Sequence, residues 1–250
     1  MTTTKKTYLN WSSGKDALIA LHIVHKAGGY DIQKLVTTIN DDLQRVSMHG
    51  VSVNLLQAQA NALQLPLHMI ALRGSVSLSV YNETMNEHMQ KLIKEGFGYA
   101  IFGDILLEDL KTYREKELSK VGLQAVFPLW KKDTLSLARE FIDLGYKAIV
   151  VCTSAKNLDA SFCGREFNHK FLKDLPHDVD PCGENGEFHT FVYDGPLFKH
   201  PISFKKGEKV MRSYEPSNKN ADDDCFKGQT FWDNQFWFQE LEEPNSPEKA

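Results

Sequence analysis

The sequence contains little cysteine. Four cysteines are spread over 250 residues, and Cys152, Cys163, Cys182 and Cys225 lack the short paired spacings of a zinc site or a redox dithiol. The nine histidines show no metal-binding spacing either. We therefore expect free thiols. A persulfide on Cys182 would make the protein a sulfur transferase, but the absence of a partner thiol nearby in the sequence disfavours that function.

An excess of positive charge is also missing. The formal net charge of -4 at pH 7 gives no sign of a general nucleic-acid-binding surface. Residues 1–6 are polar and lack the apolar core of a signal peptide, and no later apolar run is long enough to span a membrane. We expect a cytoplasmic protein of one or two domains, without membrane or general nucleic-acid partners.

Two common phosphate-binding signatures are incomplete at the junction between a strand pattern over residues 8–11 and a helix pattern that starts at Lys15. The junction reads Ser-Ser-Gly-Lys-Asp-Ala over residues 12–17. A Walker A loop needs Ser or Thr after the lysine, but Asp16 follows Lys15. The dinucleotide fingerprint needs three spaced glycines, and only Gly14 is present. Both signatures are therefore excluded.

The same junction still suits an anion. The first amides of a helix have no partner inside it and carry the positive end of its dipole, so they favour phosphate. Gly14 allows close approach of a ligand, and Lys15 adds a mobile cationic donor. The alternative is that Ser12 or Ser13 only caps the helix, with Lys15 and Asp16 on its solvated first turn.

A second segment, residues 181–196, gathers polar groups around glycines before it becomes a strand pattern. Its polar residues and glycines include Gly183, Glu184, Asn185, Gly186, Glu187, His189 and Thr190. Glycine allows the backbone to direct such groups toward one point. The aromatic residues Phe188, Phe191 and Tyr193 are typical of a strand that would anchor that point on a sheet.

These motifs together resemble the PP-loop (N-type) ATP pyrophosphatases of the adenine nucleotide alpha hydrolase-like superfamily. Residues 12–17 are similar to their SGGKDS loop, with Ser13 in place of the second glycine and Ala17 in place of the last serine. Residues 183–192 resemble the GENGEFHTFV-type segment of one branch, the diphthine–ammonia ligase family. Further matches lie at residues 103–105, 113–117, 122–123 and 127–130, so the resemblance covers roughly the first two hundred residues.

The resemblance implies an ATP-dependent amide ligase. A substrate carboxylate would attack the α-phosphate of ATP, pyrophosphate would leave, and ammonia would open the acyl-adenylate to an amide. The acceptor is a carboxylate on a small molecule or a protein side chain, and the family's named substrate is a modified histidine of a translation elongation factor. The charge stabilisation that such chemistry needs would come from Lys15 and the helix amides.

The resemblance also implies the residues of the site. The ATP ligands would be Ser12, Ser13, Gly14, Lys15, Asp16, Asn40, Gly103 and Asp104, with Mg²⁺ at Asp16 and Asp104. The catalytic residues would be Lys15, Asp16, Glu184, Glu187 and His189. The substrate side would comprise Arg114, Gly183, Glu184, Asn185, Gly186, Glu187, His189 and Thr190. Two alternatives stay open: Asp16 as a helix cap, and Arg114 as the partner of Glu117 in a surface ion pair.

Two other functions stay open as alternatives to the amide ligase. The first is a nucleotide-binding sensor of the same fold that holds ATP or AMP without turnover, for which Ala17 is the main support. The second is a PP-loop enzyme that modifies RNA, which the acidic charge balance and the unpaired cysteines disfavour.

The first half of the chain alternates strand and helix patterns. Strand patterns cover residues 35–39, 67–72 and 99–102, and helix patterns cover residues 51–63, 76–95 and 106–121. This alternation predicts an α/β fold, a Rossmann-like (HUP-type) parallel sheet with helices on both faces. Ligands of such sheets lie beyond the carboxyl ends of the strands. Residues 12–17, Asn40 and Gly103-Asp104 all fall at such ends, so they can converge on one nucleotide.

The second half predicts a smaller α+β domain. Helix patterns cover residues 134–144 and 165–175, and strand patterns cover residues 148–151, 188–193, 202–204, 209–214 and 230–239. We place a PP-loop nucleotide-binding domain at 1–123, a substrate-side domain at 124–242 and a disordered tail at 243–250. The second domain would fold back over the first, with the active site in the cleft between them.

An aromatic cluster lies near the end of the chain. Its members are Phe231, Trp232, Phe236, Trp237 and Phe238. The simpler interpretation is a terminal strand that completes the core of the second domain. The alternative is that its outer face covers a second subunit, which leaves a homodimer open. The acidic run over residues 222–224 is interpreted as part of a solvated loop.

Overall fold

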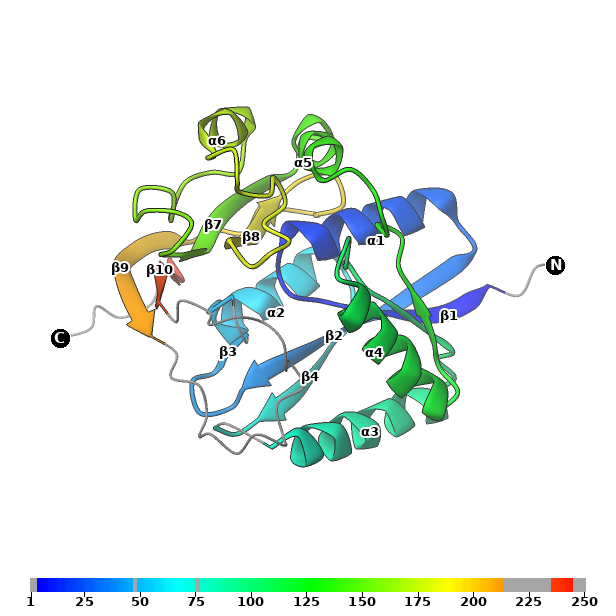
Figure 1. The fold of residues 1–250 in the computed structure, drawn as a ribbon. Helices are drawn as coiled ribbons and strands as arrows, with labels where there is room; N and C mark the ends of the chain where they lie inside the picture. Colours follow the sequence, from blue (N-terminus) through cyan, green and yellow to red (C-terminus); the bar gives the residue numbers. More distant parts are fainter. Residues whose placement is uncertain (1–3, 47–48, 75–76, 214–234, 245–250) are drawn as a thin grey trace.

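The computed structural model describes residues 4–46, 49–74, 77–213 and 235–244. These residues form two sheets with helices around them (Figure 1). Cys225, the acidic run 222–224, Phe231, Trp232 and most of the predicted tail lie outside the described residues, so the predictions made for them stay predictions. None of the described helices is long and apolar enough to cross a membrane.

The first sheet is mainly parallel. Its parallel strands are β1 (Lys5–Asn10), β2 (Tyr30–Asn40), β4 (Leu67–Leu72), β5 (Tyr99–Ile101) and β6 (Gln124–Val126), and the short β3 (Arg45–Val46) pairs antiparallel with β2. The parallel strands lie in the order β4-β2-β1-β5-β6. After β1 the chain adds β2 and β4 on one side of the sheet, and it then adds β5 and β6 on the other side. The strand order therefore reverses between β1 and β5, where α/β sheets bind ligands.

Helices cover both faces of this sheet. They are α1 (Lys15–Ala27), α2 (Val53–Ala62), α3 (Leu78–Lys94) and α4 (Glu108–Lys120). One core cluster joins Leu9 and Leu35 of the strands to α1 and α2. A second joins Tyr8 and Val36, on the opposite face, to α3 and α4. The predicted α/β fold with helices on both faces is therefore confirmed.

The second sheet is antiparallel, in the order β8-β7-β10-β9. Its elements are α5 (Thr134–Asp143), β7 (Lys147–Ser154), α6 (His169–Asp174), β8 (Phe188–Asp194), β9 (Lys205–Ser213) and β10 (Gln235–Glu242). In Figure 1, α1 lies between the first sheet and this second unit. Leu18 of α1 shares one core cluster with Phe141, Phe171 and Phe188. The smaller α+β unit is thus present and packs directly on α1.

Several elements differ from the sequence expectations. The helix expected over 165–175 is shorter, because Phe167 donates its backbone N–H to Ala148 O at 2.8 Å and the side chain of Asn168 caps α6. No strand forms at 202–204, and β9 begins after this segment, at Lys205. The strand β6 was not expected, because its three residues are too few to show a pattern.

The aromatic residues of β10 lie mostly inside the chain's own core. Phe236 and Phe238 are buried, and Trp237 is half-buried. The simpler interpretation of this strand therefore accounts for the described part of the cluster. The homodimer stays a prediction.

The loops that follow β1 and β5 touch each other at the edge where the strand order reverses. A methyl group added to Gly103 would lie 2.8 Å from the carbonyl carbon of Asp16 and 2.9 Å from the backbone nitrogen of Ala17. No side chain fits in that space. Glycine at position 103 is thus what allows the phosphate-type loop and the Asp104 loop to meet.

We predict that Gly103→Ala destabilises the fold by about 2 kcal/mol, because the added methyl group collides with backbone that cannot move aside. Gly98→Ala is the matched control, since a methyl group at position 98 meets nothing within 4 Å. Urea unfolding followed by circular dichroism measures both. Equal midpoints for the two variants would contradict the close approach of the loops.

Candidate active site

The loop over residues 12–17 is attached directly to the second sheet. Val192 of β8 donates its backbone N–H to Ser13 O at 3.0 Å, and Lys15 donates its own backbone N–H to the hydroxyl of Thr190 at 3.0 Å. The side-chain amide of the buried Gln59, in α2, donates to Ser13 O at 3.0 Å and also to Val192 O. The two motifs found in the sequence are therefore in contact, and the cavity of the site lies beside their junction.

Ser13 has a backbone conformation that favours glycine. Its φ is 75°, in the left-handed region where a Cβ atom costs roughly 1–2 kcal/mol. Its hydroxyl oxygen is buried and has no hydrogen-bond partner among the described residues. The SGGKDS loops that residues 12–17 resemble carry glycine at this position. The chain therefore keeps a backbone conformation typical of glycine although the residue is serine.

Lys15 is buried rather than mobile. It is only 2% exposed, and its ammonium donates to Cys182 O and, at 2.9 Å, to Asp16 Oδ2. The rings of Phe167 and Phe188 lie 5.6 and 5.1 Å from Nζ. Burial acts to lower the pKa of Lys15, but nearby negative groups, above all Asp16, outweigh it and raise the pKa above its ordinary value. The charged ammonium of Lys15 therefore links α1 to the glycine-rich segment.

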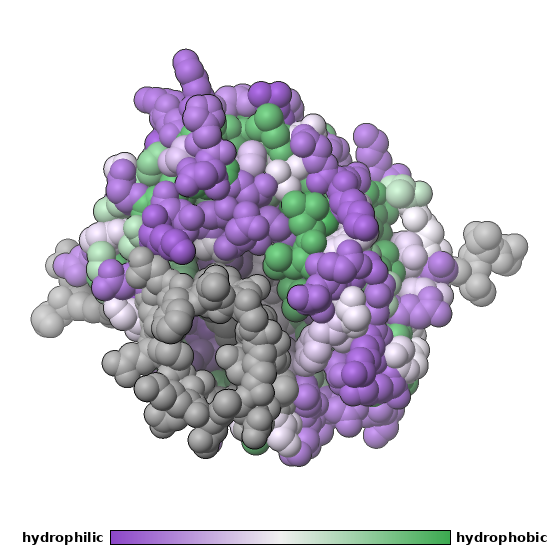
Figure 2. All heavy atoms as spheres, viewed as in Figure 1, coloured by the Kyte–Doolittle hydropathy of each residue, from purple (hydrophilic) through white to green (hydrophobic). Residues whose placement is uncertain are grey.

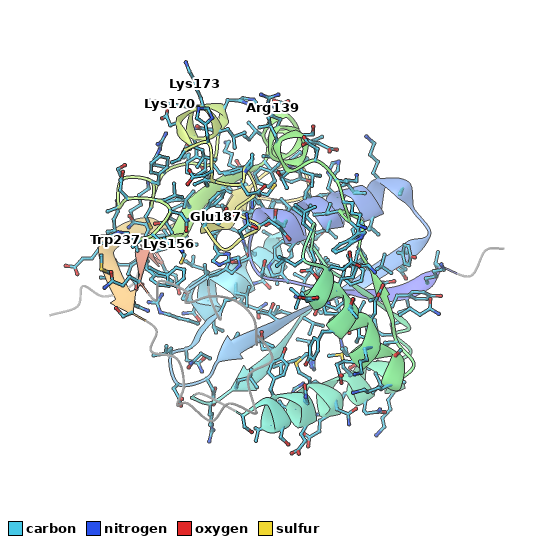
Figure 3. All side chains as sticks on the ribbon, in the orientation of Figure 1. Arg139, Lys156, Lys170, Lys173, Glu187 and Trp237 are labelled. Carbon is cyan, nitrogen blue, oxygen red and sulfur yellow. The ribbon has the colours of Figure 1, made fainter. Side chains whose placement is uncertain are left out.

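The glycine-rich segment is folded around two carboxylates. Glu187, labelled in Figure 3, accepts from the backbone N–H groups of Asp180 and Asn185 at 3.0 and 2.9 Å and from the Asn185 side chain at 3.0 Å. Asp180 accepts from the backbone N–H groups of Cys182 and Glu184 at 2.8 and 3.2 Å. Glu187 is 2% exposed, so the structure places it inside the turn, where it shapes the segment.

A cavity of about 1430 Å³ opens beside this junction. Residues of the first unit that line it include Ser12, Asp16, Ala17, His49, Gly103, Asp104 and Arg114. The second unit contributes Gly183, Glu184, Asn185, Gly186, His189 and Lys156, the last labelled in Figure 3. Ligand sites usually measure about 300–1,000 Å³, so this cavity has room for two ligands. On one side its rim is apolar, since Leu107 lines the cavity and is 37% exposed, and Figure 2 shows a hydrophobic patch over the loop before α4.

Three of the acidic residues that line this cavity, Asp16, Asp104 and Glu184, have raised pKa values. Burial raises the pKa of Asp16 and Asp104 and raises that of Glu184 to about 7, and the negative charge of Asp16 raises the other two further. Glu184 Oε1 accepts from the backbone N–H groups of Ile105 and Leu106 at 3.1 and 3.3 Å. Carboxylates brought together at such a cost in solvation suit a site that binds a cation.

Arg114 belongs to the same cluster. Its Nε lies 3.1 Å from Asp104 Oδ2, and its guanidinium lies 4.3 Å from the centre of the Phe102 ring. Glu117, the partner that helical spacing offered, pairs instead with Lys120 at 2.7 Å. The surface ion pair between Arg114 and Glu117 is therefore wrong as an interpretation. Asp104 Oδ2 is buried and accepts no hydrogen bond from the described residues.

His49 lines the cavity although no motif in the sequence indicated it. Its ring stacks on that of His189 with centroids 4.5 Å apart, and its Nδ1 lies 3.2 Å from Thr190 O. It lies in a turn before α2, followed by Gly50, and a turn alone does not indicate a binding residue. Only the packing of this turn against β8 brings it to the site. Gln59, which ties three segments together, gave no signal in the sequence for the same reason.

Other residues singled out in the sequence have local partners. Asn40 Oδ1 accepts from the backbone N–H of Leu43 at 2.9 Å in the turn after β2, and Asn40 is not among the cavity-lining residues. The thiol of Cys182 donates to Thr134 O at 3.2 Å, and burial raises its pKa. A thiol held neutral in this way is a poor nucleophile, which weakens the sulfur-transferase alternative. Among the described residues no group of three His, Cys, Asp or Glu side chains could hold a metal by itself.

Comparison with known proteins decides the family. The diphthamide synthase N-terminal domain matches residues 5–125, and the diphthamide synthase C-terminal domain matches residues 133–216. Diphthine–ammonia ligase of Mus musculus is 31% identical over 191 residues, which covers 70% of this chain and 71% of that protein. The chain belongs to the diphthine–ammonia ligase family.

Other members of the family agree. The diphthine–ammonia ligase of Homo sapiens is 28% identical over 190 residues, and it too covers 70% of this chain and 71% of its own length. A solved structure of the U34-tRNA thiolase NcsA from Methanococcus maripaludis with its [4Fe-4S] cluster reaches a TM-score of only 0.35 at 14% identity over 57% of each chain, so nothing is concluded from it. Family membership confirms the prediction of an ATP-dependent enzyme that forms a carbon–nitrogen bond.

We predict that Ser13→Gly stabilises the protein by about 1 kcal/mol. The change relieves the left-handed backbone and removes a buried hydroxyl without a partner, which together outweigh the greater entropy of the unfolded glycine chain. Gln64→Gly is the matched control, because Gln64 also has a positive φ, of 58°, but an exposed side chain. The free energies of unfolding in urea give both values. A Ser13→Gly variant less stable than the native chain would contradict the strain.

We predict that stability falls with rising pH because of Glu184. The folded chain holds a proton on Glu184 up to about pH 7, whereas the unfolded chain releases it near 4.5, so the folded state binds more protons in that window and loses stability as pH rises through it. The loss between about pH 5 and about pH 8 should be about 2 kcal/mol after discounting for partial exposure. Unfolding at both pH values measures it.

Glu184→Gln should remove this loss, and Glu208→Gln, at an exposed position of β9, should leave it unchanged. If the stability of the Glu184→Gln variant keeps the full pH dependence of the native chain, the carboxyl group does not titrate as described.

Proposed function

We propose that this chain activates the carboxylate of a diphthine-like acceptor with ATP and then joins it to ammonia. The observation that carries the proposal is the convergence of the loop 12–17, the Gly103-Asp104 loop and the segment 183–190 on one cavity of about 1430 Å³. The curated relatives are named for the same pair of substrates, diphthine and ammonia. The identity of the physiological acceptor is inferred from those names and is therefore part of the proposal.

The triphosphate is assigned to the N-terminus of α1. Thr190 already takes the backbone N–H of Lys15, so the remaining amides of the first turn and the hydroxyl of Ser12 are the donors for phosphate. Lys15 acts through its charge, from its buried position beside Asp16. Arg114 provides a second cation at the cavity wall.

Magnesium fits the carboxylates that face the cavity. Mg²⁺ is usually held by one or two carboxylates together with substrate phosphates, which agrees with the absence of a three-residue metal group among the described residues. Asp16 and Asp104 are the residues that would hold it; Asp104 Oδ2 accepts no hydrogen bond from the described residues but lies 3.1 Å from Arg114 Nε. When bound, the ion would neutralise charge on the phosphates and offset part of the cost of burying the two carboxylates, which is the main cause of their raised pKa values.

The reaction consists of two displacements. The acceptor carboxylate attacks the α-phosphorus and forms a P–O bond, the bond to the β-phosphate oxygen breaks, and pyrophosphate leaves with the electron pair. Ammonia then attacks the acyl carbon, AMP leaves, and the nitrogen releases one proton to solvent. The residues of this chain position the groups and stabilise charge, which supplies most of the catalysis in phosphoryl transfer.

Each unit has its own part in this scheme. The proposed division into residues 1–123 and 124–242 changes at its boundary, because β6 (Gln124–Val126) pairs with β5 in the first sheet; we assign the nucleotide to the first unit. Glu184 and His189 of the second unit face the acceptor and ammonia. The exposed Leu107 at the cavity wall suits an acceptor carried by a larger molecule.

The proposed function is tested by the release of products. The chain is incubated with ATP, Mg²⁺, ammonium chloride and a diphthine-bearing acceptor protein, and pyrophosphate and AMP are measured. We expect equal amounts of both, only when the acceptor is present. Pyrophosphate release that ignores the acceptor, or nucleotide binding without any release, would overturn the proposal.

We predict that Asp104→Asn raises the Mg²⁺ concentration needed for half-maximal pyrophosphate release by about tenfold, the equivalent of one weakened charged ligand at about 1.4 kcal/mol. Asp109→Asn, at an exposed position of α4, is the matched control and should change nothing. An unchanged Mg²⁺ requirement in Asp104→Asn would place the ion elsewhere.

A further inference from the structure

The stacked pair His49 and His189 is the strongest cluster that the scheme above does not explain. The two rings lie at an angle of 27° with centroids 4.5 Å apart, and both residues line the cavity. They come from distant parts of the chain, one from the loop before α2 and one from β8. The contact of His49 Nδ1 with Thr190 O and the place of His189 in β8 hold the two rings in this arrangement.

The pair lies against the phosphate-type loop. A methyl group added to Gly14 would lie 2.9 Å from Cε1 of His49 and 3.3 Å from Thr190 O. The ring of His49 therefore fills the space beside the residue that precedes α1. An acyl group attached to a phosphate bound at this helix end would lie within reach of the pair.

The hydrogen bond of His49 fixes its tautomer. Nδ1 lies 3.2 Å from Thr190 O, and a carbonyl oxygen only accepts, so Nδ1 carries the hydrogen. The lone pair of a neutral imidazole is then on Nε2. His49 thus provides a hydrogen-bond acceptor without a negative charge.

The charges around the pair favour a neutral donor over a cation. Burial lowers the pKa of both rings, that of His189 to about 4, and the ammonium of Lys15 lowers both further. The same surroundings that disfavour an imidazolium disfavour an ammonium ion. The carboxylates Asp16 and Glu184 interact with Lys15, whereas Lys15 is the charged side chain that acts on the two histidines.

We propose that Nε2 of His49, beside the ring of His189, forms the subsite that accepts an N–H bond of neutral ammonia. A carboxylate at this position would bind ammonium instead and keep its nitrogen protonated and without a lone pair. A neutral acceptor binds the nucleophilic form. The proposal rests on the proposed function, and it identifies the part of the cavity wall that receives the second substrate.

In the amide-forming step the bound ammonia directs its lone pair away from His49 toward the acyl carbon. The new C–N bond forms as the bond from the acyl carbon to the AMP oxygen breaks, and the excess proton leaves the nitrogen for solvent. His49 holds the nucleophile by accepting one of its N–H bonds and is not itself protonated.

The kinetic test separates this subsite from a structural role. In His49→Asn the amide can still donate to Thr190 O but no longer offers an acceptor at the place of Nε2, and in His49→Gln the longer amide does. We expect the KM for ammonia to rise about tenfold in His49→Asn, as for one lost hydrogen bond, and to recover in part in His49→Gln. The KM for ATP and the release of pyrophosphate before ammonia is added should not change.

His88→Asn is the matched control. His88 also pairs with a second histidine, at 2.7 Å from Nε2 of His68, but it does not line the cavity. The KM of the His88→Asn variant for ammonia should equal that of the native chain. An equal rise in the KM values for ammonia and ATP in His49→Asn would show a structural role and overturn the subsite.

A binding measurement keeps the subsite testable if the proposed reaction fails. Ammonium chloride is titrated into ¹⁵N-histidine-labelled protein at several pH values below the pKa of the ammonium ion, with tetramethylammonium chloride as the control salt. We expect the Nε2 resonance of His49 to shift with ammonia alone, and the total ammonium needed to fall about tenfold per pH unit as the neutral form grows. If the total ammonium concentration at half-saturation does not depend on pH, the ammonium ion binds. If the resonance does not shift, neither ammonia nor ammonium binds there. Either result would overturn the subsite.

Discussion

The site depends on the charge buried at Lys15. This ammonium lies at the first residue of α1 and donates to a backbone carbonyl of the glycine-rich segment, so it joins two parts of the chain that are 167 residues apart. A buried cation is tolerated only when its partners satisfy it, and Asp16, Cys182 O and two aromatic rings do so here. The interaction therefore determines how the two units are placed.

Much of the fold follows from local patterns. The alternation of strands and helices indicated the parallel sheet, because strands covered on both faces are apolar along their length and their helices are amphipathic. The loop after β1 was recognisable because free helix amides, Gly14 and Lys15 lie together at its end, which suits an anion. Gly103-Asp104 was recognisable by its place at a strand end, and the structure puts it in contact with Asp16.

The internal contacts of the site could not be found in this way. Lys15 looks like a free phosphate ligand in the sequence, and only the packing of β8 against α1 shows that it is enclosed. Glu187 and Thr190 look like ligands of the substrate, yet one shapes a turn and the other takes a backbone amide of the helix. His49 and Gln59 carry no local signal of a binding residue. These roles depend on contacts between segments far apart in the sequence.

The contact between the loops of β1 and β5 has a consequence for how the enzyme works. Since Gly103 leaves no room for a side chain between them, neither loop can shift without displacing the other. Hydrogen bonds with β8 restrain the loop after β1, and hydrogen bonds to Glu184 restrain the loop after β5. The catalytic edge is thus assembled before ATP arrives, and little binding energy has to be spent on ordering it. Such a rigid template would select its nucleotide by fit and leave adaptability to the apolar rim, where acceptors of different size can be accommodated.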